Sequence, residues 1–99
     1  MRHVIVTYKV KPECVDEHLS LLGAVFNELV RARPPGVRYA ATRASDGVGF
    51  THIAVFEGPG NPLTALASFQ AFVRDVNRRC DGAPRPLDVT VVGDYGIFS

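Results

Sequence analysis

The stretch GFTHIAVFEG, residues 49–58, decides how this chain folds, because it is the clearest β-strand in the sequence. Aromatic and β-branched residues fill it, and a glycine stands at each end. The pair Asp46-Gly47 separates it from a second strand-like run, GVRYAATR, at residues 36–43. Asp-Gly between two such runs is a strong signal for a tight hairpin. The centre of the chain therefore predicts two antiparallel strands joined by a short turn.

Helical patterns flank this hairpin on both sides. Upstream, an apolar stripe with helical spacing ends at Pro34-Pro35-Gly36, and its members are Val15, Leu19, Leu22, Phe26, Leu29 and Val30. Downstream, Asn61-Pro62 marks a helix start, and a second stripe follows as Leu63, Leu66, Phe69, Val73, Val76 and Cys80. We expect His18 to lie beside the first stripe and to face solvent.

Two further strands complete the pattern, HVIVTYKV at residues 3–10 and LDVTVV at residues 87–92. The resulting order is strand, helix, strand, strand, helix, strand. This βαββαβ order predicts the ferredoxin-like α+β fold, a four-stranded antiparallel sheet with two helices on one face. At 99 residues the chain suits a single domain, residues 1–99.

Net charge, cysteine content and hydropathy indicate which partners and which cellular location to expect. The formal net charge is +1 and the basic residues are scattered, which gives no reason to expect nucleic acid or a membrane as partner. Cys14 and Cys80 are far apart in sequence, and reduced thiols fit them better than a disulfide. There is no signal-peptide core and no apolar run long enough to cross a bilayer, so we expect a soluble, cytoplasmic protein.

The first strand suggests which sheet face meets the helices. Its Val4, Val6 and Val10 side is uniformly apolar, so we place it under the helices and expect His3, Ile5 and Thr7 on the opposite face. If Asp46-Gly47 is a two-residue turn, the hairpin pairs are Arg43 with Phe50, Ala41 with His52, Tyr39 with Ala54, and Val37 with Phe56. A longer loop with an odd number of residues would shift this register by one and move Tyr39 to the other face. We expect the core to join Leu22, Phe26, Leu29, Leu66, Val73 and Val76 to Val4, Val6, Ile53 and Val55.

This assignment turns His52 away from the helices. His52 then shares a face with His3, Ile5, Thr7, Tyr39, Ala41 and Ala54, a mixture of polar and small residues that is typical of a ligand cavity. The same face would leave Phe50, Phe56, Tyr39 and Ile5 uncovered. Such an apolar patch favours a second copy of the chain as its cover, through a two-fold interface.

The segments RHVIVTYKVKP, GFTHIAVFEG and NPLTALASFQAF resemble the dimeric α/β barrel superfamily. Within it the chain is similar to the antibiotic-biosynthesis monooxygenase-like domains and to the stress-responsive A/B barrel proteins, which include the plant polyketide cyclase olivetolic acid cyclase. The resemblance implies a homodimer of ferredoxin-like subunits that holds a small-molecule cavity. It also implies that His3 in RHVIV and His52 in FTHIA line that cavity. The chain has no histidine in its second helix, where the cyclase has its catalytic one, and no tryptophan.

These observations give a hypothesis about function. His52 and His3 are candidate bases, because an imidazole titrates near neutral pH, and Tyr39 is a candidate donor to a developing oxyanion. Candidate substrate contacts are Ile5, Thr7, Ala41, Ala54 and Phe69. The predicted activity is that of a monooxygenase or polyketide cyclase that acts on an aromatic or polyketide-like molecule without a cofactor or a metal.

Each of these assignments has an alternative. The histidines also fit a role as buried, hydrogen-bonded residues of the dimer interface, and Tyr39 fits a role as a filling aromatic. The rival to an enzyme is a non-catalytic barrel that binds or carries a small ligand. A histidine-bound metal is disfavoured, because no carboxylate or thiolate falls at a recognisable spacing.

Overall fold

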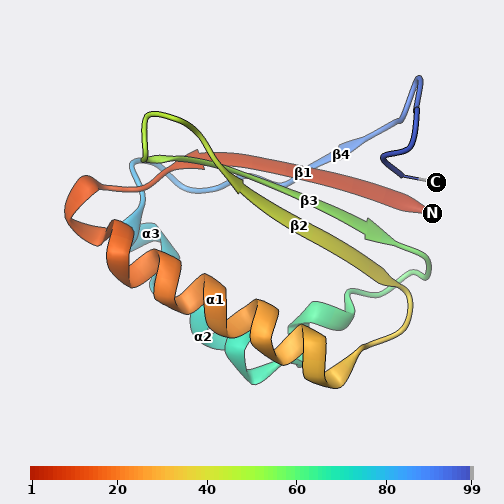
Figure 1. Cartoon of the computed structure of the whole chain (residues 1–99), viewed down its shortest axis with the longest axis horizontal. Helices are drawn as coiled ribbons and strands as arrows, with labels where there is room; N and C mark the ends of the chain where they lie inside the picture. Colours follow the sequence, from red (N-terminus) through yellow and green to blue (C-terminus); the bar gives the residue numbers. More distant parts are fainter. Residues whose placement is uncertain (99) are drawn as a thin grey trace.

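The computed structural model describes residues 1–98 and contains one four-stranded antiparallel sheet with helices packed on one side (Figure 1). The sheet order is β2-β3-β1-β4. In chain order the elements are β1 (Arg2–Lys9), the 3₁₀ turn η1 (Pro12–Cys14), α1 (Val15–Ala32), β2 (Val37–Arg43), β3 (Gly49–Phe56), the 3₁₀ turn η2 (Pro62–Ala65), α2 (Ala67–Val73), α3 (Val76–Arg79) and β4 (Leu87–Val89). The predicted ferredoxin-like α+β fold is confirmed.

The hairpin between β2 and β3 has the predicted register. Ala41 is paired with His52, and Tyr39 with Ala54. The Asp46 carboxylate closes the turn, since its Oδ1 accepts hydrogen bonds from the backbone N–H groups of Val48 at 3.0 Å and Gly49 at 2.9 Å. Gly47 has a φ of 83°, the left-handed conformation that glycine adopts without steric cost. The expected two-residue turn is wrong, because the Ala44 N–H donates to the Gly49 carbonyl at 2.7 Å and residues 45–48 form the loop. This loop also has an even number of residues, so the register is the predicted one.

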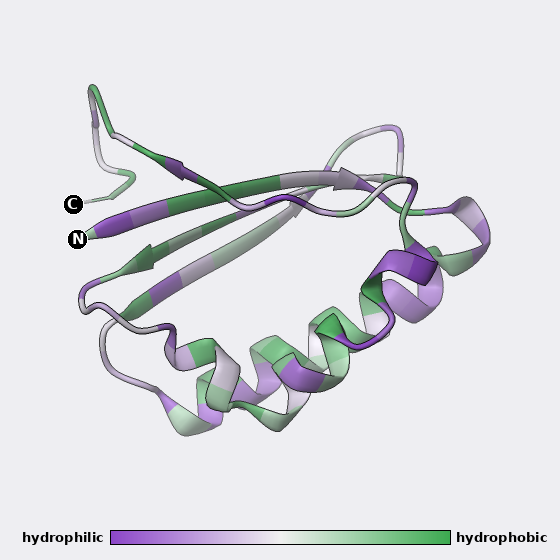
Figure 2. Ribbon diagram, turned by 180° about the vertical axis from the view of Figure 1, so that it is seen from behind, coloured by the Kyte–Doolittle hydropathy of each residue, from purple (hydrophilic) through white to green (hydrophobic). Residues whose placement is uncertain are grey.

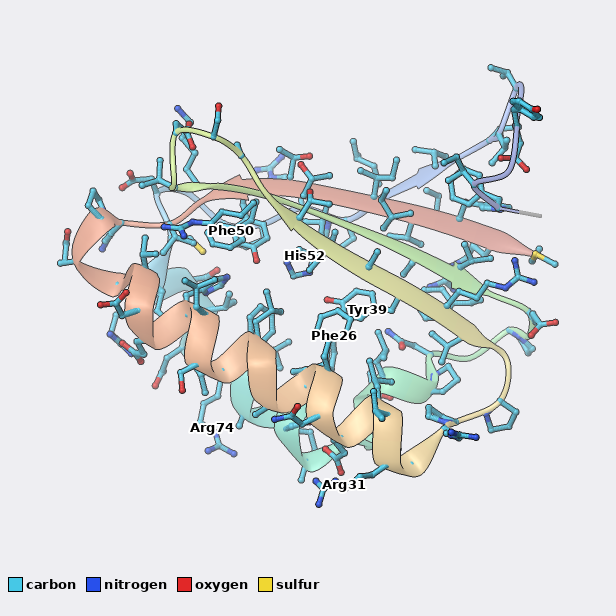
Figure 3. All side chains as sticks on the ribbon, viewed as in Figure 1. Phe26, Arg31, Tyr39, Phe50, His52 and Arg74 are labelled. Carbon is cyan, nitrogen blue, oxygen red and sulfur yellow. The ribbon has the colours of Figure 1, made fainter. Side chains whose placement is uncertain are left out.

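The expected orientation of β3 is wrong. In the register between β1 and β3, Val6 lies opposite His52 and Val4 opposite Ala54. Cross-strand partners share a face, so His52 points toward the helices together with the valines of β1. Ring contacts confirm this direction, because the His52 ring lies 5.9 Å from that of Phe72 in α2. Figure 3 shows His52 in the layer between the sheet and the helices.

The physical reason for this error is that no local turn connects β1 to β3. A helix and β2 separate them in sequence, and a shift of one residue in their pairing moves every side chain of β3 to the other face. The helix-facing side of the sheet carries Val4, Val6, Tyr8, Tyr39, Ala41, Phe50, His52, Ala54 and Phe56. The open side carries His3, Ile5, Thr7, Thr51, Ile53, Val55, Leu87 and Val89.

This assignment corrects two further expectations. Ile53 and Val55 were expected in the helix-facing core, and they lie on the open side instead. Phe50, Phe56 and Tyr39 were expected to be uncovered, but both phenylalanines are buried and the Tyr39 ring stacks on that of Phe26 in α1 at 5.2 Å. Of the four residues expected to form the uncovered apolar patch, Ile5 alone lies on the open side.

The expected second helix is broken into three pieces. The turn η2 begins after Asn61, whose Oδ1 accepts the Leu63 N–H at 3.0 Å, as its N-cap position predicts. The break between α2 and α3 falls at Arg74 and Asp75, where Asp75 has a left-handed φ of 61°. Val73 is 46% exposed beside this break, contrary to its expected place in the core. The last strand is also shorter than predicted, three residues rather than six.

The buried face of α1 differs from the predicted stripe. Its buried members are Val15, His18, Leu22 and Val25, which follow one another at spacings of three, four and three residues. His18 is 0% exposed, so the expectation that it faces solvent is wrong, and Val30 is 71% exposed. Figure 2 shows hydrophilic and hydrophobic residues alternating around the helices, as expected for helices with one buried face.

Candidate functional site

A cavity of about 350 Å³ lies between the helix-facing side of the sheet and the segments α2 and α3. Its volume is in the range of small-molecule pockets. The wall is largely apolar and is formed by Val4, Val6, Ala54, Phe56, Phe69, Phe72, Val73, Val76, Pro84 and Pro86. The polar groups on it are few, and they are supplied by Arg2, Tyr8, Tyr39, His52, Asn61 and Asn77. Such a site suits a mostly apolar molecule with one or two polar atoms.

Three of the polar groups on the cavity wall are joined by hydrogen bonds around His52. The Tyr39 hydroxyl lies 2.5 Å from His52 Nδ1, and the Tyr8 hydroxyl lies 2.7 Å from His52 Nε2. Both ring nitrogens of His52 are therefore engaged by tyrosine oxygens. Figure 3 shows Tyr39 and His52 side by side in this layer.

The strand register explains how these three side chains meet. Val6 of β1 and Ala41 of β2 lie directly opposite His52, and both are small enough to leave space beside the imidazole. Tyr8 and Tyr39 stand two positions along their strands from these partners, on the same face. Diagonal neighbours of this kind are about 7–8 Å apart, a distance that aromatic side chains can bridge. His52 thus receives one tyrosine from each neighbouring strand.

The hydrogen bonds around His52 continue into the helices. The Tyr8 hydroxyl also lies 2.7 Å from His18 Nε2 of α1, and Arg79 Nε of α3 donates to His18 Nδ1 at 3.2 Å. We call this series of hydrogen-bonded side chains the relay, and its members in order are Arg79, His18, Tyr8, His52 and Tyr39. The relay runs from a buried guanidinium to a tyrosine hydroxyl on the cavity wall. It joins five elements of the fold: α3, α1, β1, β3 and β2.

Arg79 is buried without a carboxylate partner among the described residues. It is 1% exposed, and its Nη1 donates to the Arg74 carbonyl at 3.1 Å while its Nη2 donates to the Phe72 carbonyl. These carbonyls are available because α2 ends there, and the last carbonyls of a helix have no partner within the helix. The C-terminal end of a helix also favours a cation. The guanidinium lies 5.4 Å from the centre of the Phe72 ring as well.

Burial keeps the two histidines and the two tyrosines of the relay in their neutral forms. It lowers the pKa of His52 to about 4, with a smaller effect from the neighbouring His18. Burial also lowers the pKa of His18 to about 4, and the charge of Arg79 acts in the same direction. The pKa values of Tyr8 and Tyr39 are raised, again mainly by burial. At neutral pH the relay therefore carries one charge, on Arg79.

The structure separates the candidate site residues into two groups. His52, Tyr39, Ala54 and Phe69 line the cavity, and Ala41 lies on the same side of the sheet but outside the lining. His3, Ile5 and Thr7 lie on the open side, so the expectation that they share a face with His52 is wrong. The His3 ring contacts the ring of Phe98 at 5.1 Å, and the Thr7 hydroxyl bonds that of Thr51 at 3.2 Å.

Sequence reasoning missed three members of the relay, His18, Tyr8 and Arg79. A signal for His18 was present, because it stands three residues after Val15 and four before Leu22 on a helical face. Tyr8 belongs to the strand face that was correctly placed under the helices. Arg79 gave no signal, since an arginine near a helix end is normally solvent-exposed and favourable for the helix dipole there.

In residues 1–98 no three histidine, cysteine, aspartate or glutamate side chains come together to hold a metal ion. None of the helices described combines the length and apolar character needed to cross a bilayer.

Comparison with solved structures shows clear similarity over nearly the whole chain. A protein from Bacteroides thetaiotaomicron, provisionally described as an antibiotic biosynthesis monooxygenase, has a TM-score of 0.81 at 15% identity and covers 99% of this chain and 94% of its own. One from Nitrosomonas europaea with the same provisional description has a TM-score of 0.76 at 13% identity, over 96% of this chain and 93% of that one.

A variant of SnoaB, a cofactor-independent oxygenase from Streptomyces nogalater, has a TM-score of 0.70 at 16% identity, over 97% of both chains. No family model and no curated protein sequence matches the chain. The chain therefore has the fold of antibiotic biosynthesis monooxygenase-like proteins, as the resemblance in its sequence implied.

Proposed function

We propose that the protein is a cofactor-independent enzyme of the monooxygenase or cyclase type, and that it binds an aromatic or polyketide-like molecule in the cavity. The observation that carries the proposal is the hydrogen bond between Tyr39 and His52 on the wall of an otherwise apolar cavity. An apolar wall binds the rings, and one polar pair orients a single oxygen. The fold shared with SnoaB, which is described as a cofactor-independent oxygenase, supports this class of activity.

The proposed chemistry begins with loss of an acidic proton from the bound molecule. A phenol, or a carbon next to a ketone, loses such a proton to water and leaves an anion with its charge on oxygen. The Tyr39 hydroxyl donates to that oxygen, and a preorganised donor in a largely apolar site is an effective way to stabilise such charge. In an oxygenase, the anion then adds dioxygen to give a peroxide, which loses water and leaves a new carbonyl. In a cyclase, it adds to a carbonyl carbon of the same molecule, and the carbonyl oxygen takes up a proton.

Two observations argue against His52 as the base that removes this proton. A histidine that removes the proton itself needs a free, basic nitrogen facing the substrate. Both nitrogens of His52 are engaged by tyrosine hydroxyls, and its pKa of about 4 makes it a weak base. We propose that His52 assists proton loss through Tyr39, by holding the hydroxyl that receives the anion.

The same observation favours a second candidate, a non-catalytic barrel that binds or carries a small ligand. No unengaged histidine nitrogen lines the cavity among the described residues. A binding protein needs the apolar wall and the orienting hydroxyl, but it needs no base. The two candidates agree on where the ligand binds and differ on whether it is converted.

Calorimetric titration with 2-naphthol tests ligand binding. We expect binding to the wild type and a loss of roughly 3- to 10-fold in affinity in Tyr39→Phe, the usual range for one neutral hydrogen bond. Tyr95→Phe is the matched control, because Tyr95 is 97% exposed and should leave the affinity unchanged. Absence of binding to the wild type, or equal losses in both variants, would contradict the proposed site.

Conversion is tested with anthrone, an aromatic ketone with an acidic methylene group. Anthrone and one dioxygen give anthraquinone and one water, so oxygen consumption and product absorbance must rise together. We expect a rate above that of buffer, and a reduced rate in Tyr39→Phe and His52→Gln. Binding of anthrone with no gain in rate would favour the carrier over the oxygenase.

A further inference from the structure

We propose that Arg79 is a positioning residue that fixes the direction of every hydrogen bond in the relay, that is, which partner donates the proton. The Tyr39 hydroxyl then always donates into the cavity. The site would thereby select a ligand whose polar atom accepts a hydrogen bond, such as a ketone, an enolate or a phenolate. The selection of ligands rests on the proposed function. The direction of the relay does not, because it is a property of the free protein.

The direction begins at the guanidinium. Arginine stays protonated in proteins and offers only donors, so the contact between Arg79 Nε and His18 Nδ1 requires that Nδ1 accept. A neutral imidazole carries its proton on the other nitrogen when one nitrogen accepts. His18 is fully buried, with a pKa of about 4, so it is neutral. Its proton is therefore on Nε2.

The proton on His18 Nε2 determines the next two bonds. It points at the Tyr8 oxygen, 2.7 Å away, so Tyr8 accepts there. The hydroxyl proton of Tyr8 is then free to donate to His52 Nε2, also 2.7 Å away. A tyrosine hydroxyl has one proton, and only this arrangement satisfies both of its contacts.

The hydrogen bond between His52 and Tyr39 is the last one, and it reaches the cavity wall. His52 accepts on Nε2, so as a neutral imidazole it carries its proton on Nδ1 and donates to the Tyr39 oxygen at 2.5 Å. The Tyr39 proton is left for another acceptor, since this hydroxyl makes no other hydrogen bond within residues 1–98. Because Tyr39 lies on the cavity wall, that acceptor is supplied by the ligand.

Two physical consequences follow from a fixed direction. Hydrogen bonds that point the same way polarise one another, so the Tyr39 hydroxyl becomes a better donor than an isolated tyrosine. Reversing the relay would require Arg79 to give up its proton, which does not occur in proteins. A ligand whose only polar atom is a donor would leave the Tyr39 proton unsatisfied in a largely apolar cavity.

The direction can be tested in the free protein, through the protonation of each histidine ring nitrogen seen in proton–nitrogen correlation NMR spectra. At pH 7 we expect His18 neutral with its proton on Nε2, and His52 neutral with its proton on Nδ1. His3, on the open side, serves as a reference signal. A charged ring at either position, or His52 with its proton on Nε2, would overturn the proposal whether or not any ligand binds.

The part taken by Arg79 is tested by substitution. In Arg79→Met we expect His18 to lose its single protonation form and give a mixture of two. Arg78→Met is the matched control, because Arg78 pairs with Glu17 at the surface and should leave both histidines unchanged. Arg79→Lys also offers only donors, so it should keep the single His18 form. If the methionine variant does not fold, the neutral Arg79→Gln takes its place. Unchanged His18 spectra in a folded methionine or glutamine variant would overturn the proposal.

Ligand selection is tested with two apolar bicyclic probes, 2-acetylnaphthalene, which only accepts, and indole, which only donates. We expect Tyr39→Phe to weaken the ketone by roughly 3- to 10-fold and to strengthen indole binding, because the variant lacks the donor that indole leaves unsatisfied. Arg79→Met should weaken the ketone to a smaller extent. Equal effects on both probes would overturn the selection. Failure of both probes to bind a wild type with the expected histidine forms would contradict the proposed function and leave the relay intact.

Discussion

At the scale of single residues, the protein keeps two histidines neutral by burying them and giving each nitrogen a fixed partner. His18 and His52 are 0% and 4% exposed, and no buried side-chain nitrogen or oxygen lacks a hydrogen bond in the described residues. A protonated imidazole at either position would face donors where it now accepts, from Arg79 and from Tyr8. Protonation and the native arrangement of these residues are therefore in competition.

This competition predicts how stability depends on pH. Both histidines have a pKa of about 4 in the folded chain and about 6.5 when unfolded, so between these values the unfolded state binds more protons. The free energy of unfolding should therefore fall as pH drops from about 6.5 to about 4, by up to about 1.4 kcal/mol per pH unit for each histidine. Urea unfolding at a series of pH values measures this slope.

Histidine variants test whether the pH dependence of the free energy of unfolding comes from His18 and His52. Folded His52→Gln should lose about half of the dependence, and His3→Gln, on the open side, should retain nearly all of it. A free energy of unfolding that is flat across this pH range would contradict the neutral, buried state of both rings.

At the scale of elements, α1 and the β2–β3 hairpin pack through a layer of aromatic rings. Phe50 is 2% exposed, its ring stacks with that of Tyr8 at 5.8 Å, and the His18 ring meets it at 5.0 Å. On the same helix, Phe26 stacks on Tyr39. The members of the relay are thus held in place by the packing of rings as well as by hydrogen bonds.

The packing of this layer predicts a large effect for Phe50→Ala. Removal of a fully buried aromatic ring leaves a cavity, so we expect a loss of about 3–5 kcal/mol in the free energy of unfolding. Val30→Ala, on the exposed side of α1, should change it by less than about 0.5 kcal/mol. Chemical denaturation of both variants measures the difference. Similar small losses would mean that Phe50 is not in the core.

At the scale of the whole molecule, the open side of the sheet has little cover from this chain. The segment after β4 reaches one end of it, where Arg38 donates to the Phe98 carbonyl at 2.5 Å (Figure 1). Leu87 of β4 is 63% exposed, and Val92, Tyr95 and Ile97 of the following segment are also exposed. Exposed apolar residues gathered in one region are typical of an interaction surface.

We propose that a second copy of the chain covers this side, and we predict a dimer. Sedimentation at micromolar concentration should give twice the mass of 10.8 kDa. Ile53→Lys places a charge in the middle of the open side and should shift the equilibrium toward monomer, whereas Val30→Lys on α1 should not. A wild type that sediments as a monomer at this concentration would contradict the prediction.

The sequence by itself determined the order of strands and helices and the register of the hairpin, because these depend on interactions between near neighbours. Asp46-Gly47 closes its own turn, so the pairing of Ala41 with His52 could be predicted. A further signal was available, since Arg38 and Thr42 mark the polar side of β2 and leave Tyr39 on the helix-facing side. Strand polarity on β2 was therefore a better guide to the faces than Ile53 and Val55 on β3.

Only the tertiary structure decided which way His52 points and what it touches. Its direction depends on the register between β1 and β3, which lie far apart in sequence, and a shift of one residue reverses it. Arg79 is buried because the chain breaks between α2 and α3 and frees two carbonyls for it. The relay joins residues from five elements, and no local pattern brings them together. Long-range packing alone makes a site from them.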